Sequence, residues 1–320
     1  MAQAAFARDI HVDNSTGDDR YMGQSLTISA GQQGPLRTLQ KAVRIAKPGD
    51  RIVIHPTGYP FHEEVIISGI TRPSPTKDFP IVIEGNGALL DGLVGIDPML
   101  GRDMGGGLFR FETQLGPTHT SDILFVDGKP ATLGTNRGEG GRPQLEAGQF
   151  APWNGWLTYQ LAKGDFIDRH AFAVSRLNVG LTIYRSDYWI IRNLDFRGYR
   201  LDGVRIHGPV EGLEFQHCKF LYNGRAGIAA KGLTEAAVLD SESIGNAKAA
   251  AVSRNLTRLG LTRIRSEGSP IAVDADGTSS IRVIAGEPQK PELKLTPIPE
   301  KKAPTEEPTK KAAKKTEEDL

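Results

Sequence analysis

Ile191-Arg-Asn193-Leu-Asp-Phe196 is the first of four similar segments that decide the fold. We read each segment as apolar, x, polar, x, x, apolar, and their closing residues are 24, 24 and 20 residues apart. The other three segments are Phe215-Gln-His217-Cys-Lys-Phe220, Leu239-Asp-Ser241-Glu-Ser-Ile244 and Leu259-Gly-Leu261-Thr-Arg-Ile264. Self-similarity at such a short period predicts a repeat architecture.

A further strand-like segment opens seven residues after each closing residue. These segments are Gly203-Val-Arg-Ile206, Gly227-Ile-Ala-Ala230, Ala251-Val252 and Ile271-Ala-Val273. Each period therefore holds three short strands separated by turns, which is one coil of a solenoid whose inner face only neighbouring coils can bury. The ladder of leucine-rich repeats and the 3.6-residue apolar period of helical repeats are both missing from these segments. We therefore predict an all-β chain that forms a parallel β-helix.

The coils resemble right-handed parallel β-helix repeats of the pectate-lyase-like superfamily. A coil of that superfamily runs strand, polar corner, strand, turn and Gly-apolar-x-apolar strand, and residues 189–206 follow this order with Asn193 at the corner. The segments Ile10-His-Val-Asp-Asn-Ser-Thr-Gly17 and Ile81-Val-Ile-Glu-Gly-Asn-Gly87 are also similar to the opening of many secreted bacterial members. The resemblance implies the fold but selects no activity, because the fold hosts lyases, hydrolases, epimerases and non-catalytic surface proteins.

Ahead of the coils the sequence predicts one short amphipathic helix and three strands. Apolar residues recur at helical spacing from Leu36 to Ala46, and Lys47-Pro-Gly49 ends the helix. Short strands are expected at residues 51–54, 64–67 and 80–83, where β-branched residues precede turn residues.

The predicted β-helix domain spans residues 10–286. Residues 127–176 do not keep the coil register, and we expect an excursion of loops and a hairpin there. Glu242 and Arg254 fall at positions that should face inward, so either the last coils open out or the assumed register slips. Residues 287–320 hold six Pro, eight Lys and eight acidic residues but no aromatic residue, which predicts a disordered tail suited to cell-surface attachment.

Residues 1–9 are interpreted as the remnant of an export signal. Ala5-Phe-Ala7 has the small-x-small ending of a cleavage site, although a charged segment and a long apolar segment do not precede it. No apolar window reaches the ~18 residues of a membrane span. We expect a secreted, periplasmic or cell-surface protein, and the alternative is a frayed N-terminus of a cytoplasmic one.

Composition excludes several function classes. The 39 basic and 38 acidic residues give a net charge of +1, so the chain lacks the basic bias of nucleic-acid-binding proteins. Cys218 is the only cysteine, which excludes an internal disulfide and a cysteine-based metal cluster. Thirty-seven Gly and 20 Pro fit many short strands better than a few long helices.

The outward side chains of the Gly-apolar-x-apolar strands form the candidate site. Alternation along each strand and stacking of the coils at ~4.8 Å should align Tyr184 with His207 and Lys231. The resemblance implies a substrate groove on this face, where cations would hold uronate carboxylates and Tyr184 would contact sugar rings. The expected catalytic residues are Arg205, Lys231 and His207, and the expected substrate-binding residues are Tyr184, Arg200, Asp202, Asn223 and Arg225.

Two reactions are considered for this face. A β-eliminating lyase needs a base beside a cation, and Arg205 or Lys231 would need a lowered pKa to serve as that base. A glycoside hydrolase needs two carboxylates, for which Asp202 with Asp187 or Glu211 is the best pair in the sequence. The residues favour a polysaccharide lyase over a glycoside hydrolase if the protein is an enzyme.

No cofactor is expected, and only one segment of the sequence resembles a set of metal ligands. The segment Asp13-Asn-Ser-Thr-Gly17-Asp18-Asp19 is dense in oxygen atoms that Ca²⁺ would accept, but such clusters ordinarily form turns. The sequence thus predicts an exported β-helix protein that binds an acidic polysaccharide, and it leaves open whether the protein also cleaves the polymer by β-elimination. The alternative is a non-catalytic surface or scaffold solenoid whose outward cations only keep the sheet soluble.

Overall fold

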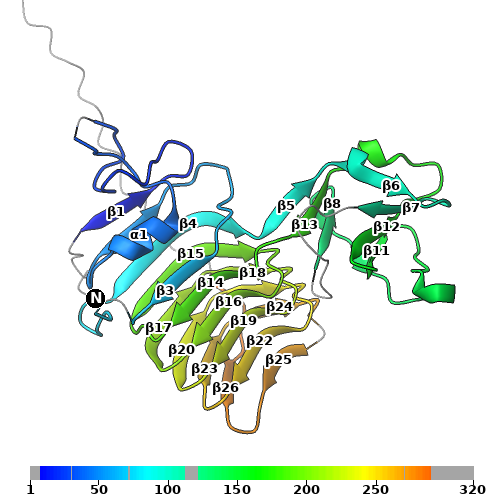
Figure 1. Cartoon of the computed structure of the whole chain (residues 1–320). Coiled ribbons are helices and arrows are strands. Elements are labelled where there is room, and N and C mark those ends of the chain that lie inside the picture. The colour runs from blue at the N-terminus through cyan, green and yellow to red at the C-terminus, as the bar shows by residue number, and fades with distance from the viewer. Residues whose placement is uncertain (1–7, 30, 71–72, 112–121, 270, 290–320) are drawn as a thin grey trace, which may run out of the picture. The chain divides into compact units, whose positions relative to one another are not determined.

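Apolar residues from successive coils stack in register inside the molecule. Ile191 pairs with Phe215, Phe215 with Val238, and Val238 with Leu261 along parallel strands, and all four side chains are buried. The computed structural model describes residues 8–29, 31–70, 73–111, 122–269 and 271–289. Over these residues the chain winds into the predicted right-handed parallel β-helix (Figure 1).

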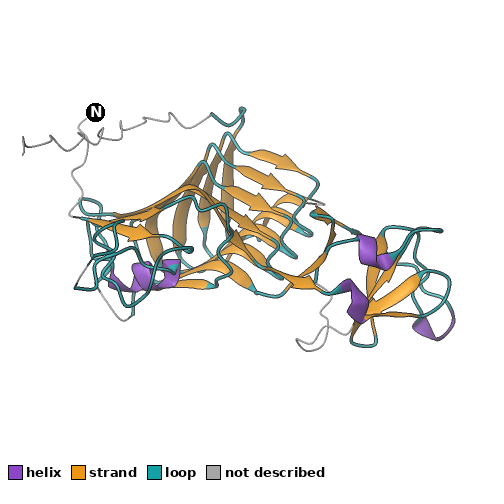
Figure 2. Cartoon of the chain, turned by 90° about the horizontal axis from the view of Figure 1, so that it is seen from above, coloured by secondary structure: helices purple, strands orange, loops and turns teal. Residues whose placement is uncertain are grey.

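Two parallel sheets build the solenoid. The larger sheet contains β1 (Asp9–Val12), β2 (Arg51–Ile54), β4 (Ile81–Asp91), β15 (Trp189–Arg197), β17 (Val210–Gln216), β20 (Thr234–Leu239), β23 (Arg258–Thr262) and β26 (Ser280–Ile284), and the short strands β18 (Lys219–Leu221), β21 (Glu242–Ile244) and β24 (Arg265–Glu267). The six-stranded sheet runs in the order β3 (Val65–Ser68), β14 (Val179–Tyr184), β16 (Asp202–His207), β19 (Ala226–Lys231), β22 (Ala249–Arg254) and β25 (Ile271–Ala275). Figure 2 shows the strands of both sheets as successive rungs.

The solenoid core combines aromatic stacking with aliphatic columns. Phe196 and Phe220 lie parallel with ring centroids 5.6 Å apart, and Phe215 meets Phe220 edge-on. Cys218 belongs to this core, and burial raises the pKa of its thiol to about 12. A thiol in such surroundings is an unreactive packing group.

Small and corner residues explain the repeating pattern. A Cβ added to Gly203 would lie 2.8 Å from the carbonyl oxygen of Gly227, which leaves no room for a side chain between these coils. The corner residues Asn193, His217 and Asp240 have φ values of 50°, 54° and 48°, a left-handed conformation that Asn and Asp tolerate better than most residues. Each corner lets the chain bend sharply within the larger sheet.

The assumed register slips in the third coil. This slip, and not an opening of the last coils, explains why Glu242 and Arg254 fell at positions expected to face inward. Phe220 pairs with Ser243 rather than with Ile244, and Ala230 pairs with Ser253. Ser243 is buried, and its hydroxyl donates to the carbonyl oxygen of Ala250 at 3.2 Å. Arg254 therefore faces outward next to Lys231 instead of entering the core.

The predicted N-terminal helix is α1 (Leu39–Ile45). Thr38 caps it by accepting a hydrogen bond from the Lys41 N–H, and the Glu63 carboxylate accepts from the N–H groups of Leu39 and Gln40 at 3.0 Å each. Burial raises the pKa of Glu63. Among the described residues, no helix has the length and apolar character needed to cross a bilayer.

The excursion from the solenoid begins at Leu93, earlier than the predicted residue 127, and is more than loops and a hairpin. One sheet runs β10 (Thr132–Leu133), β11 (Gln149–Trp153), β12 (Trp156–Gln160), β7 (Leu108–Phe111) and β6 (Gly101–Asp103), and the other runs β5 (Leu93–Ile96), β13 (Phe172–Ser175), β8 (Leu124–Val126) and β9 (Lys129–Pro130). Three 3₁₀ turns accompany them, η1 (Pro98–Leu100), η2 (Glu139–Gly141) and η3 (Ile167–Arg169). The excursion has its own apolar core, centred on Phe111, Leu157 and Phe172.

The two ends of the chain carry predictions of their own. Asp9 already belongs to β1, so the first coil starts one residue earlier than expected. Most of the predicted export-signal remnant, residues 1–7, and most of the predicted tail, residues 290–320, lie outside the described residues.

A histidine held between two carboxylates gives the excursion a pH dependence. His170 Nδ1 lies 2.7 Å from Asp127 and Nε2 lies 2.8 Å from Asp165. The hydrogen bonds to Asp127 and Asp165 raise the pKa of His170, and those from His170 lower the pKa of each carboxyl group. The histidine's stabilising contribution is thus complete below its unfolded pKa of ~6.5 and is lost as pH rises through the higher folded pKa.

We expect the His170 imidazole to titrate above ~6.5 in an NMR pH series. The variant Asp127→Asn/Asp165→Asn should return its pKa towards that value, because both charged partners are gone. The carboxylate contribution has the opposite sign and disappears as pH falls through the lowered folded pKa of the two aspartates. A wild-type midpoint at or below that of the double variant would contradict the assignment.

Candidate functional site

One row of outward side chains crosses the six-stranded sheet. The strand register pairs Tyr184 with His207, His207 with Lys231, and Lys231 with Arg254. We call these four residues the cationic column. The alignment of Tyr184, His207 and Lys231 is as predicted, and Arg254 extends it because the coil before it is one residue shorter than assumed.

His207 is the chemically adaptable member of the cationic column. Its ring lies edge-on to Tyr184 with centroids 6.5 Å apart. Burial lowers the pKa of His207, and the positive charges of Arg205 and Lys231 lower it further. The imidazole is therefore mainly neutral at neutral pH, and a neutral imidazole can accept a proton.

Asp202 lies beneath this face and not on it, so its predicted contact with substrate is corrected. Its side chain has no exposed area, and it accepts hydrogen bonds from Arg205 Nε at 2.9 Å and from Arg225 Nε at 2.7 Å. The bond to Asp202 raises the pKa of Arg225. Asp202 thus anchors two guanidinium groups, which stay protonated and suit carboxylate binding rather than proton abstraction.

Two other predicted substrate contacts also belong to the protein interior. Asn223 is fully buried, where its amide oxygen accepts from the Tyr199 N–H at 3.0 Å and its amide nitrogen donates to Asn246 at 2.9 Å. Arg200 is largely buried against Asp122, with Nε 2.6 Å from the carboxylate. Neither side chain is available to a ligand on the sheet face.

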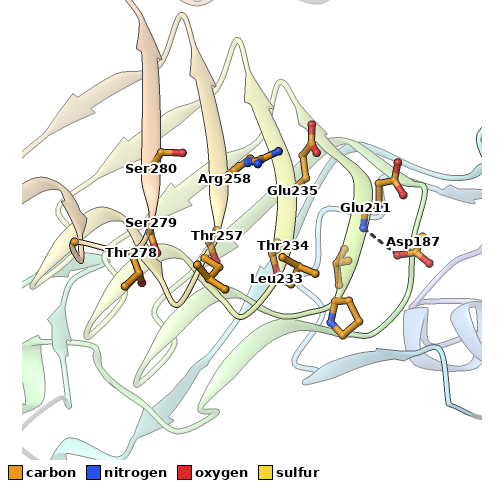
Figure 3. Close-up of a pocket in the computed structure, with 14 residues that line it drawn as sticks. Asp187, Glu211, Leu233, Thr234, Glu235, Thr257, Arg258, Thr278, Ser279 and Ser280 are labelled. Atoms are coloured by element: carbon orange, nitrogen blue, oxygen red, sulfur yellow. Dashed lines mark hydrogen bonds between the residues drawn. The ribbon is translucent and has the colours of Figure 1, made fainter.

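A pocket of about 670 Å³ follows the cationic column at the turns between the two sheets (Figure 3). Asp187, Glu211 and Glu235 line it three or four residues after Tyr184, His207 and Lys231 in their respective coils. The backbone N–H of Glu211 donates to Asp187 at 2.9 Å. The predicted hydrolase pair is therefore corrected, because Asp187 and Glu211 share this pocket whereas Asp202 is buried under the sheet face.

The Asp-rich N-terminal segment forms a turn whose oxygens bind protein donors. Asp13 Oδ1 accepts from the N–H groups of Ser15 and Thr16 at 2.8 Å each. Asp19 accepts from the Thr38 hydroxyl at 2.7 Å and so supports the start of α1. In the part of the chain that the structure describes, no cluster of three or more His, Cys, Asp or Glu is arranged to hold a metal ion.

Sequence reasoning missed Arg254 and the pocket residue Glu235. Arg254 would follow from a coil length of 23 residues in place of 24, since Lys231 pairs with Arg254. Glu235 lies 24 residues after Glu211, so the assumed coil length already placed it in the same row. The signal that could have shown the shorter coil is the run Ala249-Ala-Ala-Val252, whose first residue, not its second, pairs with Ala226.

Comparisons with known proteins support the fold. No protein-family model and no curated protein matches the sequence. A solved structure described as a glycoside hydrolase matches 87% of this chain and 77% of its own, with a TM-score of 0.58 and 11% identity. Pectate lyase Pel9A matches 87% of this chain and 62% of its own (TM-score 0.44, 11% identity), and XylC in complex with xylose matches 85% and 68% (0.42, 11%). The chain has a parallel β-helix fold, and likeness at this identity extends no further than the fold.

Proposed function

We propose that the cationic column binds an acidic polysaccharide outside the cytoplasm. The observation that carries this proposal is the register of Tyr184, His207, Lys231 and Arg254, one residue from each of four successive coils. Coils spaced by ~4.8 Å present their side chains at a regular interval to a polymer that runs along the solenoid. Arg205 and Arg225 add positive charge beside the column, and their anchoring by Asp202 reduces the entropy lost on binding.

The same residues support cleavage by β-elimination. Arg205 and Lys231 would neutralise a uronate carboxylate, and neutral His207 would take the proton from the adjacent carbon. The released electron pair forms the carbon–carbon double bond as the glycosidic C–O bond breaks, and the departing oxygen gains a proton from water. This assigns the base to His207, because an arginine side chain does not give up its proton in proteins.

Lys231→Ala should weaken binding of an acidic polysaccharide by roughly fivefold, since an exposed ion pair contributes up to about 1 kcal/mol. Arg254→Ala should weaken it less, because Arg254 already forms an ion pair with Asp274. Affinity electrophoresis in gels containing the polymer measures this, and added salt should reduce the wild-type affinity. The exposed Lys163→Ala in the excursion is the matched control and should bind like the wild type. Equal binding by all three variants, or no retardation of the wild type, would contradict the proposal and favour the scaffold alternative.

The elimination step has a separate test. Unsaturated uronates absorb ultraviolet light, so incubating the protein with acidic polysaccharides should raise the absorbance. His207→Gln should abolish the rise yet retain retardation in the gel, because it removes the base and keeps the cations. Retardation without any rise in absorbance would leave a binding protein and remove the assignment of a lyase.

A further inference from the structure

The pocket at the turns has a chemistry different from that of the cationic column. Its carboxylates come from three successive coils, and Figure 3 shows Glu211 and Glu235 projecting side by side from neighbouring strands. Arg258 is the only basic residue among those that line this pocket. A uronate would therefore meet net repulsion in this pocket, whereas the neighbouring cationic column would attract it.

Apolar side chains lie in the same pocket. Leu233 is 66% exposed and Leu256 is 61% exposed, and they occupy equivalent turns of adjacent coils, with Pro209 in the coil before them. The pocket is also fixed from beneath. Thr257 is fully buried, and its hydroxyl lies 2.9 Å from the carbonyl oxygen of Gly232 and 2.7 Å from that of Arg254. The exposed leucines thus stand on a rigid base.

An uncharged sugar matches this combination of groups. Its ring carbons can pack on leucine and proline, while its hydroxyl groups donate to carboxylates, which are acceptors only. A cavity of about 670 Å³ falls within the usual range of small-ligand sites. A charged uronate lacks this match because its carboxylate would face Glu211 and Glu235 at close range.

We infer that the pocket is a subsite for an uncharged sugar unit of the polymer whose acidic units bind the cationic column. This inference rests on the proposed function and specifies its ligand. The polymer is an acidic heteropolysaccharide that carries neutral sugars beside its uronates, and two adjacent rows of opposite charge sort the two kinds of unit.

The test compares three probes in affinity electrophoresis and calorimetry: an acidic homopolymer, a neutral oligosaccharide, and an acidic polymer with neutral branches. Leu233→Ala/Leu256→Ala should weaken binding of the branched polymer about five- to tenfold and leave the homopolymer unchanged, since each exposed leucine loses part of its apolar contact. The exposed Leu133→Ala in the excursion is the matched control and should change neither. Both leucines are largely exposed, so the protein should stay folded.

A charge reversal provides a second, independent readout. Glu211→Lys/Glu235→Lys should strengthen binding of the acidic homopolymer and weaken binding of the neutral oligosaccharide, and a merely structural role would not produce opposite changes. Equal changes for all probes, or none, would overturn the subsite. If Lys231→Ala and Arg254→Ala leave homopolymer binding unchanged, the proposed function fails. If they weaken it while the leucine and glutamate variants change no probe, only the subsite fails.

Discussion

Replacing Asp202 with alanine should lower the free energy of unfolding by about 3 kcal/mol, because it removes one partner of a buried ion pair. The Asp202 side chain has no exposed area, whereas those of Arg205 and Arg225 are 24% and 41% exposed. The variant would leave both guanidinium groups without a counterion and open a small cavity beneath the sheet face. Their partial access to water places the effect at the lower end of the range for such pairs.

Urea unfolding followed by circular dichroism measures this loss. The matched control is Glu267→Ala, which removes an ion pair with Arg265 at side-chain exposures of 53% and 45%, and should cost less than about 1 kcal/mol. Similar midpoints for the two variants would show that Asp202 does not anchor the face. Asp202→Ala should also weaken polysaccharide binding, since Arg205 and Arg225 would lose their fixed positions.

Asn223→Ala should destabilise the protein by roughly 3–5 kcal/mol, the other large effect that we expect. The fully buried Asn223 amide links three coils, since it accepts from Tyr199 N–H and donates to Asn246. Asn246 continues this ladder by donating to the carbonyl oxygen of Phe220 at 3.0 Å. Truncation leaves buried polar groups unpaired at about 1–3 kcal/mol each and adds a cavity.

Equilibrium unfolding again gives the measurement, and Asn178→Ala, an exposed asparagine just before β14, gives the control. The control should change the unfolding free energy by less than about 0.5 kcal/mol. If Asn223→Ala unfolded at the same urea concentration as Asn178→Ala, the asparagine ladder would not stabilise the coils. Polysaccharide binding at low temperature should survive in folded Asn223→Ala, because the amide does not reach the sheet face.

The coil architecture could be predicted because its interior is mostly apolar. The predicted register was wrong in the third coil, where the interior becomes polar. Ser241 takes the buried position of Cys218, and its hydroxyl accepts from the Cys218 N–H at 3.0 Å. Ser243 likewise replaces Phe220 in the next coil. Hydrophobic periodicity cannot detect such residues, because hydrogen bonds make their burial favourable.

The sequence predicted the site residues that lie on strands but not the environment of those that lie in turns. Lys231 and His207 face outward because side chains alternate along a strand, a local property of the sequence. Asn223 and Arg200 lie in turns, where no periodicity tells an exposed polar residue from a buried one. The strand pairing of the excursion was out of reach for another reason, since β7 joins β12 across more than forty residues. Such long-range pairing has no local signature.

Because each coil adds one residue to the cationic column and one turn to the pocket, the length of the proposed binding surface depends on the number of coils. Neighbouring coils interact mainly with each other, as in other solenoids, so a duplicated coil of the β19 to β21 type would insert without disturbing distant ones. Evolution can therefore change the length of this surface by adding or removing whole coils. Point substitutions can then change the charge at each position of the column.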